Sequence, residues 1–266
     1  MIRSLDIART FAHKDFRIAR SYRFAFIVGI LATAYGLVSF RFVSKVVGQG
    51  GPAGTPDEYF SFVVVGLALA GVLRASTASV GQNTRRDQVE GTLEVLATQP
   101  VSTFALGLAW SAWPVLEALF DGVVTLALAI PLGFDVSPNW PALVCALVLS
   151  AAVFLSIGFV GAAAVLAYQQ GNQIAGFAVI VMTIVSGAVF PTSVLPDWLH
   201  PLTVISPLTY SLDAMRGAIV YGKSITEVGD DLLVLLGFAV VLLPLSVAVL
   251  NAAFAFARRR GSLARF

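Results

Sequence analysis

The sequence predicts an all-α membrane protein whose single domain, residues 1–266, crosses the bilayer six times. Hydrophobic residues make up 58% of the chain and charged residues 12%, whereas soluble domains average about 45–50% and about 25%. Several apolar runs also reach the roughly 20 residues that a spanning helix needs. These observations exclude a soluble enzyme, a nucleic-acid-binding protein and a disordered chain. They predict a polytopic membrane protein that is surrounded by lipids and has no nucleic-acid partner.

Residues 2–23 are expected to form a helix that lies along the membrane surface. Apolar side chains that include Leu5 and Phe16 share one helical face, while Lys14 and Arg17 lie away from it. This pattern is typical of interfacial helices, which place a basic face among lipid headgroups.

Six apolar segments follow this helix. The stretch from Val136 to Pro196 carries no charge, and it is too long for one span, but the polar segment 169–173 divides it. The predicted spans are residues 24–47, 59–83, 102–134, 141–168, 173–190 and 232–257, and a basic tail, 258–266, comes after the last span.

Residues 191–222 are moderately apolar but are not expected to form a straight span. Four prolines fall within the first 17 of these residues, and each proline removes a backbone donor and tends to break a helix. An unsatisfied backbone group is costly in lipid. A seventh span would also place the arginines at 258–260 outside the cell. We therefore predict a re-entrant helical hairpin that enters the outer leaflet and returns.

The distribution of basic residues predicts the orientation. With both termini in the cytoplasm, twelve of the 17 lysines and arginines lie inside, four lie outside, and Arg74 lies within the membrane. This arrangement satisfies the positive-inside rule. We expect a multi-pass protein of the plasma or inner membrane with cytoplasmic N- and C-termini.

The segment 84–99, between the second and third spans, is the richest charged run inside the chain. Thr84 and Asp87 have the spacing of a capping box, which marks a helix start. Val89 and Leu93 would share one face, with acidic residues on another. A short amphipathic cytoplasmic helix that ends near Pro100 is therefore predicted.

Two motifs resemble those of the ATP-binding-cassette type-2 export permease family. The first runs from Gly91 through Glu94 and Leu96 to Ser102, and it resembles the family's coupling-helix signature, although residues 97–99 depart from the usual pattern. The second is similar to the family signature near the C-terminus. It comprises residues 186–191, 195–199 and 207–210 together with Met215 and Arg216.

The resemblance implies a transport subunit that is not itself an enzyme. It implies that the helix 84–99 sits in a cleft of a separate ATPase, and that ATP and Mg²⁺ bind there and not to this chain. No GxxxxGK[ST] phosphate loop occurs in the sequence. Two ATPase copies and either a second copy of this chain or a related permease would complete the exporter. Its cargo would be a lipid-linked glycan, an amphipathic drug or antibiotic, or a lipid.

The resemblance also assigns candidate residues to two sites. The ATPase-contact residues are Asp87, Glu90, Gly91, Thr92, Leu93, Glu94 and Leu96. The re-entrant hairpin residues are Phe190, Pro191, Leu195, Pro196, Trp198, Pro207, Tyr210 and Arg216.

Apart from Arg41 and Lys45 near the end of the first span, three charged residues fall inside predicted spans: Arg74, Glu117 and Asp121. A charge at the bilayer centre costs roughly 2.5–3.5 kcal/mol on insertion scales, so these side chains should not face lipid alone. A rise of about 1.5 Å per residue places Arg74 and Glu117 at depths that an arginine can bridge. We predict an ion pair between these two residues, with Asp121 one turn further out. The pair could fasten two helices or line the transport route.

Two other classes of function are alternatives to the exporter. In an ion-coupled secondary transporter Arg74, Glu117 and Asp121 would act as a relay, but such proteins contain inverted repeats, and no convincing repeat is present. An intramembrane enzyme would need a metal site or a nucleophile beside a base. No HExxH motif occurs, the predicted spans contain no histidine, and Cys145 is the only cysteine.

Overall fold

The computed structural model describes residues 23–47, 54–92, 102–168 and 171–260. Regular structure within these ranges is helical, with no strand, which confirms the all-α class. Five of the described helices are long and apolar enough to cross a membrane. The described residues do not include residues 2–22 of the predicted surface helix 2–23, residues 261–266 of the tail, or three of the predicted ATPase-contact residues, which are Leu93, Glu94 and Leu96.

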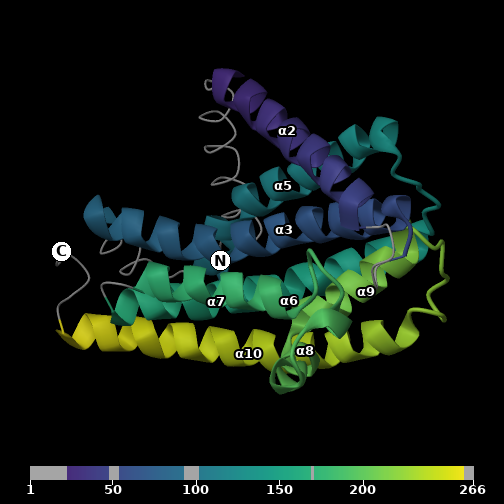
Figure 1. The fold of residues 1–266 in the computed structure, drawn as a ribbon. Coiled ribbons are helices and arrows are strands. Elements are labelled where there is room, and N and C mark those ends of the chain that lie inside the picture. The colour runs from purple at the N-terminus through teal and green to yellow at the C-terminus, as the bar shows by residue number, and fades with distance from the viewer. Residues whose placement is uncertain (1–22, 48–53, 93–101, 169–170, 261–266) are drawn as a thin grey trace.

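Figure 1 shows the described helices as one elongated bundle. The elements in chain order are α2 (Arg23–Val47), α3 (Pro56–Val89), α5 (Thr103–Ala129), the 3₁₀ turn η1 (Ile130–Leu132), α6 (Trp140–Ala167), α7 (Gly171–Val185), the 3₁₀ turns η2 (Thr192–Val194) and η3 (Asp197–Leu199), α8 (His200–Ile205), α9 (Pro207–Ile219) and α10 (Gly229–Arg260). The helix in the predicted fifth span, α7, has 15 residues, fewer than the roughly 20 that a straight span needs.

Side chains that accept a backbone N–H at the helix start determine where three of the long helices begin. Thr55 forms a capping box with Glu58 at the start of α3, where Pro56 occupies the first turn. Ser102 accepts from the Ala105 N–H at 3.2 Å, and Asn139 caps α6 in the same way. These caps satisfy donors that have no partner within the helix.

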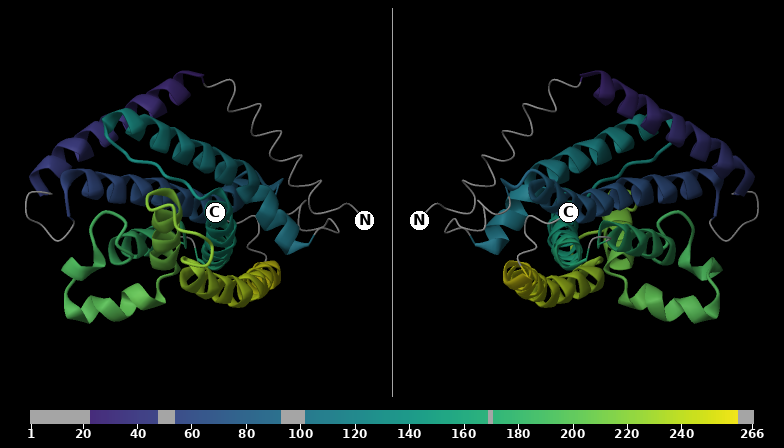
Figure 2. Two further views of the ribbon diagram at one scale, coloured as in Figure 1. Left: turned by 90° about the vertical axis from the view of Figure 1, so that its right-hand side faces the viewer. Right: turned by 90° about the vertical axis from the view of Figure 1, so that its left-hand side faces the viewer.

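The helix α3 lies between two groups of helices (Figure 2). On one side it contacts α2 and α5, and on the other it contacts α6 and α7, while α10 packs along α6. Most of the core residues of α3, such as Phe60 and Leu73, are fully buried. The helix that precedes the predicted ATPase-contact segment is therefore the one that touches the most neighbours along its length.

Two glycines allow the backbones to approach closely at this centre. A β-carbon at Gly158 of α6 would collide with the Ser76 carbonyl of α3, and one at Gly66 of α3 would collide with the Ala188 carbonyl just after α7. Small residues at such contacts let membrane helices pack through their backbones. The end of α7 is thereby held against the N-terminal half of α3.

Residues 191–222 form short helices, none of which is long enough to span a bilayer. Pro201 and Pro207 lie in the first turns of α8 and α9, where the missing N–H leaves no hydrogen bond unmade. The prolines therefore start helices here. The end of α9 is tied to the start of α6, because the Ser137 and Asn139 N–H groups donate to the Ile219 and Ala218 carbonyls.

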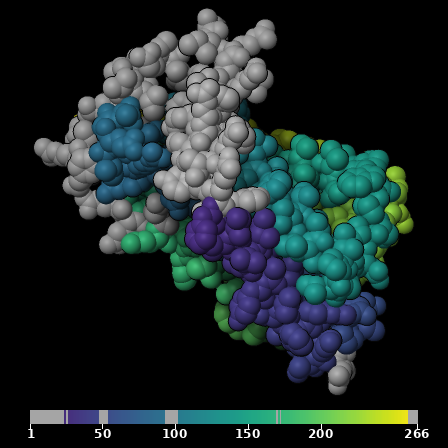
Figure 3. All heavy atoms as spheres, turned by 90° about the horizontal axis from the view of Figure 1, so that it is seen from above, coloured from purple at the N-terminus to yellow at the C-terminus, as the bar shows by residue number. Residues whose placement is uncertain are grey.

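Figure 3 shows α2, in purple, on the face of the molecule seen from above. Its apolar side chains Phe24, Tyr35 and Val46 are each more than 75% exposed, and among the described elements its extensive contacts are with α3 and α5. In a membrane protein such a face meets lipid or a second protein chain.

Candidate functional site

The segment between the second and third spans does not begin a new helix at Thr84, as the sequence predicted. Helix α3 is unbroken from Pro56 to Val89, and the Thr84 hydroxyl donates back to the Val80 carbonyl at 2.7 Å. A threonine within a helix can make this bond in place of a cap. The predicted helix start is therefore wrong.

Helix α3 ends instead at Glu90 and Gly91. Glu90 is the C-cap of α3, and Gly91 has φ +71°, a left-handed conformation that glycine adopts at little cost. The Arg86 side chain pairs with Glu90 at 2.7 Å, and Thr92 is exposed. Three predicted ATPase-contact residues, Glu90, Gly91 and Thr92, thus form an exposed end to the longest helix in the described bundle.

Asp87 is half-buried and joins this exposed end to α5, because its Oδ1 accepts from the Thr92 hydroxyl at 3.2 Å while its Oδ2 faces α5. The Trp110 indole Nε1 donates to Asp87 Oδ2 at 2.7 Å, and the Asn83 amide donates to the Trp110 carbonyl at 2.7 Å. The Trp110 side chain is only 2% exposed, and its ring stacks on that of Phe254 in α10 with centroids 6.3 Å apart. One buried tryptophan therefore connects the ends of α3, α5 and α10.

Trp110 and Asn83 were not identified from the sequence. The sequence does carry a partial indication of this contact. A buried tryptophan N–H needs an acceptor, and Asn83 and Asp87 lie four residues apart on one face of a helix, where both can reach the same neighbour. The partner of Asp87 lies 23 residues away, however, and the packing of α5 against α3 decides that contact.

The predicted ion pair between Arg74 and Glu117 is wrong. No such pair occurs in the described part of the chain, both residues are exposed, and Glu117 accepts a hydrogen bond from the Trp113 side chain. Asp121, one turn further along α5, is also exposed.

The rotation of α3 and α5 about their own axes keeps Arg74 and Glu117 apart, although the two residues are predicted to lie at similar depths in the membrane. A β-carbon added at Gly122 of α5 would lie 4.0 Å from the Ala68 β-carbon of α3, so these two positions face each other. At 3.6 residues per turn, Arg74 lies about 120° around α3 from Ala68, and Glu117 about 140° around α5 from Gly122. Both charges therefore point away from the seam between the helices.

Arg216 of the predicted hairpin is the most buried charged side chain in the described residues, at 6% exposure. Its guanidinium donates to the Phe62 carbonyl (3.1 Å from Nη2), the Gly187 carbonyl (2.9 Å) and the Ala188 carbonyl (3.2 Å). Its Cζ lies 3.4 Å from the Phe62 ring centroid. Arg216 therefore fastens α9 to α3 and to the residues after α7.

The other predicted hairpin residues are divided between the core and the surface. Tyr210 donates its hydroxyl to the Val204 carbonyl at 3.0 Å, which holds α8 against α9. Leu195 and Pro207 are buried, Phe190, Pro191 and Tyr210 are half-buried, and Pro196 and Trp198 are exposed.

Comparisons with known proteins agree with this architecture. The sequence model of the ABC-2 type transporter family matches residues 9–220. The chain is similar to nodulation protein J of Rhizobium meliloti, with 28% identity over 73% of this chain and 74% of that protein. It is also similar to nodulation protein J of Sinorhizobium fredii, with 27% identity over 65% and 67% of the two chains.

A further relative is the inner membrane transport permease YadH of Escherichia coli K12, with 23% identity over 60% of this chain and 62% of YadH. The family match covers well over half of the chain, and it includes the end of α3 and the whole of the α8–α9 hairpin. These matches and the apolar helical bundle agree on a membrane transport subunit, and the chain belongs to the ABC-2 type transporter family.

Proposed function

We propose that this chain is the transmembrane subunit of an ATP-driven exporter in the plasma or inner membrane. In this proposal a separate ATPase subunit, present in two copies, binds ATP and Mg²⁺ and docks on the exposed end of α3 and the residues that follow it. The cargo is a lipid-linked glycan, an amphipathic drug or antibiotic, or a lipid. The permease contributes the path through the membrane and performs no chemistry on the cargo.

The connection through Trp110 is the observation that carries this proposal. A force applied just beyond Val89 acts on a helix with no break back to Pro56. The Asp87–Trp110 hydrogen bond and the Trp110–Phe254 stack pass that displacement to α5 and α10. A solvated connector with no mechanical role would not need a buried indole bonded to its carboxylate. The geometry suits a docking point that moves three spans together.

The orientation in the proposal has this docking point in the cytoplasm. Arg85, Arg86, Arg258 and Arg259 all lie at the end of the bundle where α3 and α10 finish (Figure 1), as the positive-inside rule expects of a cytoplasmic face. In this arrangement α7 forms a sixth span. The segment 191–222 then enters the outer leaflet and returns, with Arg216 holding it against α3 and the end of α7.

A second copy of this chain, or a related permease, completes the transport route in this proposal. Glu117 and Asp121 are exposed on α5 in the single chain, and carboxylates at membrane depth are costly against lipid. A partner permease or a water-filled route beside α5 removes that cost. The exposed apolar face of α2 gives such a partner a surface to pack against.

Co-purification with the candidate ATPase tests the docking point. Leu93→Asp and Glu94→Arg alter the predicted contact itself, and both are expected to reduce the ATPase retained on the tagged permease. Asp197→Arg is the matched control, because it makes a similar charge change in η3, which directly precedes α8 and lies away from the end of α3 (Figure 1). It should leave retention unchanged.

The readouts separate loss of docking from loss of folding. Each variant is first compared with the wild type for expression and for a monodisperse elution profile in detergent. If the wild type retains no ATPase, or if Leu93→Asp and Glu94→Arg retain it as well as Asp197→Arg does, the docking assignment is wrong. A transport assay in vesicles with each cargo class then identifies the substrate.

A further inference from the structure

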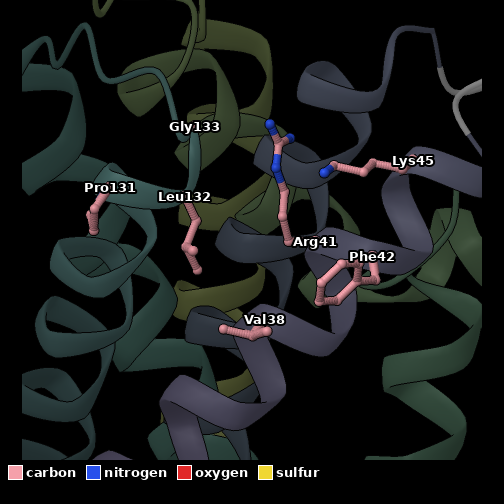
Figure 4. A pocket seen from close by; sticks show the side chains of 7 residues that line it. All are labelled: Val38, Arg41, Phe42, Lys45, Pro131, Leu132 and Gly133. Carbon is pink, nitrogen blue, oxygen red and sulfur yellow. The ribbon is translucent and has the colours of Figure 1, made fainter.

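A pocket of about 480 Å³ lies where the last turns of α2 meet η1, at the end of the bundle opposite the arginine-rich end. Two cationic side chains, Arg41 and Lys45, line one part of it, and apolar side chains that include Val38, Phe42 and Leu132 line the rest. Figure 4 shows the charged ends of Arg41 and Lys45 pointing toward the same part of the pocket, near Gly133, with Val38 on the far side of the pocket and the Phe42 ring between.

Arg41 is held in place from three sides. Its Nη1 pairs with Asp57 Oδ1 at 2.5 Å, and its Cζ lies 5.3 Å from the Phe60 ring centroid. Its Nη2 lies against Gly133, where an added β-carbon would be 2.9 Å from that nitrogen. The guanidinium is therefore preorganised, with one nitrogen bound to the carboxylate and the other at the pocket wall.

Lys45 lies one helical turn beyond Arg41 on the same face and is exposed. Its Nζ lies 5.6 Å from the Phe42 ring centroid, and no acidic side chain pairs with it within the described ranges. The nearby Glu58 is already engaged in the capping box with Thr55. Two cations are thus balanced by one close carboxylate, that of Asp57, and the mouth of the pocket attracts anions.

The pocket also has a direction along the bundle. Val38 lies one turn before Arg41 and two turns before Lys45 along α2, so the cationic part of the pocket is nearer the end of the helix than the apolar part at Val38. An inorganic anion would leave the apolar part unfilled, and a neutral amphiphile would leave the cations without a partner. The two parts together match a molecule with an anionic head and a hydrocarbon chain.

We propose that this pocket binds the phosphate headgroup of an anionic membrane lipid, with Lys45 and Arg41 on the phosphate and the hydrocarbon chain against Phe42 and Leu132. In the orientation proposed above, the binding leaflet is the outer one. The site is independent of the ATPase, because every residue that forms it belongs to this chain and lies at the other end of the bundle.

Native mass spectrometry of the purified permease, without any ATPase, tests this site. The wild type is titrated with phosphatidylglycerol, phosphatidylcholine and inorganic phosphate. Phosphatidylglycerol is expected to bind more tightly than phosphatidylcholine, and inorganic phosphate is not expected to displace it. If the two lipids bind equally, the cations do not select the headgroup; if inorganic phosphate displaces the lipid, the ligand is a free anion. Either result overturns the proposal.

Variants with a matched control locate the site. Lys45→Gln is expected to weaken phosphatidylglycerol binding about fivefold, the factor that corresponds to roughly 1 kcal/mol for one basic residue near an anionic surface. Lys223→Gln removes another exposed lysine and should have no such effect. Asp57→Asn removes the carboxylate that competes for Arg41 and should strengthen binding. Equal effects of Lys45→Gln and Lys223→Gln would refute the assignment to this pocket.

Discussion

Replacement of Arg216 by methionine is expected to lower the free energy of unfolding by roughly 3–5 kcal/mol. The guanidinium donates to the carbonyls of Phe62, Gly187 and Ala188, and methionine keeps the bulk but supplies no donor. A hydrogen bond to a charged group contributes about 1.5–3 kcal/mol, and a buried acceptor left without a donor costs about 1–3 kcal/mol. Relief from burying the charge offsets part of the sum of these terms.

The melting temperature of the purified permease in detergent measures this loss. For a chain of this size about 1 kcal/mol shifts the midpoint by roughly 2–4 °C, so Arg216→Met should melt roughly 10 °C below the wild type. Arg216→Lys keeps the charge but not the planar fork that reaches several carbonyls, and it should fall between the two. The order wild type, lysine, methionine is the expected signature.

Asp213→Asn provides the control for this prediction. Asp213 lies 3.9 Å from Arg216, and its side chain is 55% exposed. Because the carboxylate is more than half exposed and 3.9 Å from the guanidinium, the pair is expected to contribute about 1 kcal/mol or less, so the variant should melt within about 3 °C of the wild type. If Asp213→Asn is as destabilising as Arg216→Met, the ion pair is the important contact. If Arg216→Met melts with the wild type, the carbonyl contacts contribute nothing to stability.

Three further predictions concern the docking region and the loops. Trp110→Phe keeps an aromatic ring but removes the N–H that bonds to Asp87. It should reduce the stimulation of ATPase activity by cargo while the permease still retains the ATPase. Stimulation equal to that of the wild type would contradict the mechanical role of Trp110. Gly133→Ala should lower the melting temperature of the permease more than Gly91→Ala does. Both glycines have positive φ, but only the β-carbon added at Gly133 would press on a neighbouring group, the Arg41 guanidinium. The reverse order would contradict this packing. Hydrogen bonds from the Ser224 backbone N–H and hydroxyl lower the pKa of Glu227, so the turn that they form is stabilised at neutral pH and loses that stabilisation as the pH falls through the lowered pKa. Over that pH range, amide hydrogen exchange of residues 224–228, relative to the intrinsic rate, should become faster in the wild type but not in Glu227→Gln.

The fold class and most helix positions follow from composition and charge, because these patterns reflect the solvent around the chain. Four of the predicted spans contain or overlap helices of spanning length at 27–47, 103–132, 140–167 and 229–259, and a fifth lies within the long helix 56–89. The predicted fifth span corresponds to a shorter helix, because Gly187, at φ +75°, is part of the turn that follows Val185.

The candidate sites were predictable only where a residue's role depends on its near neighbours in the chain. The exposed positions of Glu90, Gly91 and Thr92 follow from a helix that ends at a glycine. The helix start at Thr84 was wrong because a threonine inside a helix has the same local pattern as a cap. The buried partners of Asp87 and Arg216 lie 23 or more residues away, and no local pattern specifies them.

The sequence by itself determined that the chain is a helical membrane protein with one arginine-rich end, since hydrophobicity and charge act on each segment separately. The tertiary structure decided which charges meet. It turned Arg74 and Glu117 away from each other although their depths agree, brought Trp110 to Asp87, and placed Arg216 on three carbonyls. The physical reason is that a contact between two helices depends on their rotation about their own axes, and close packing at small residues such as Gly66 and Gly158 fixes that rotation for α3 and its neighbours.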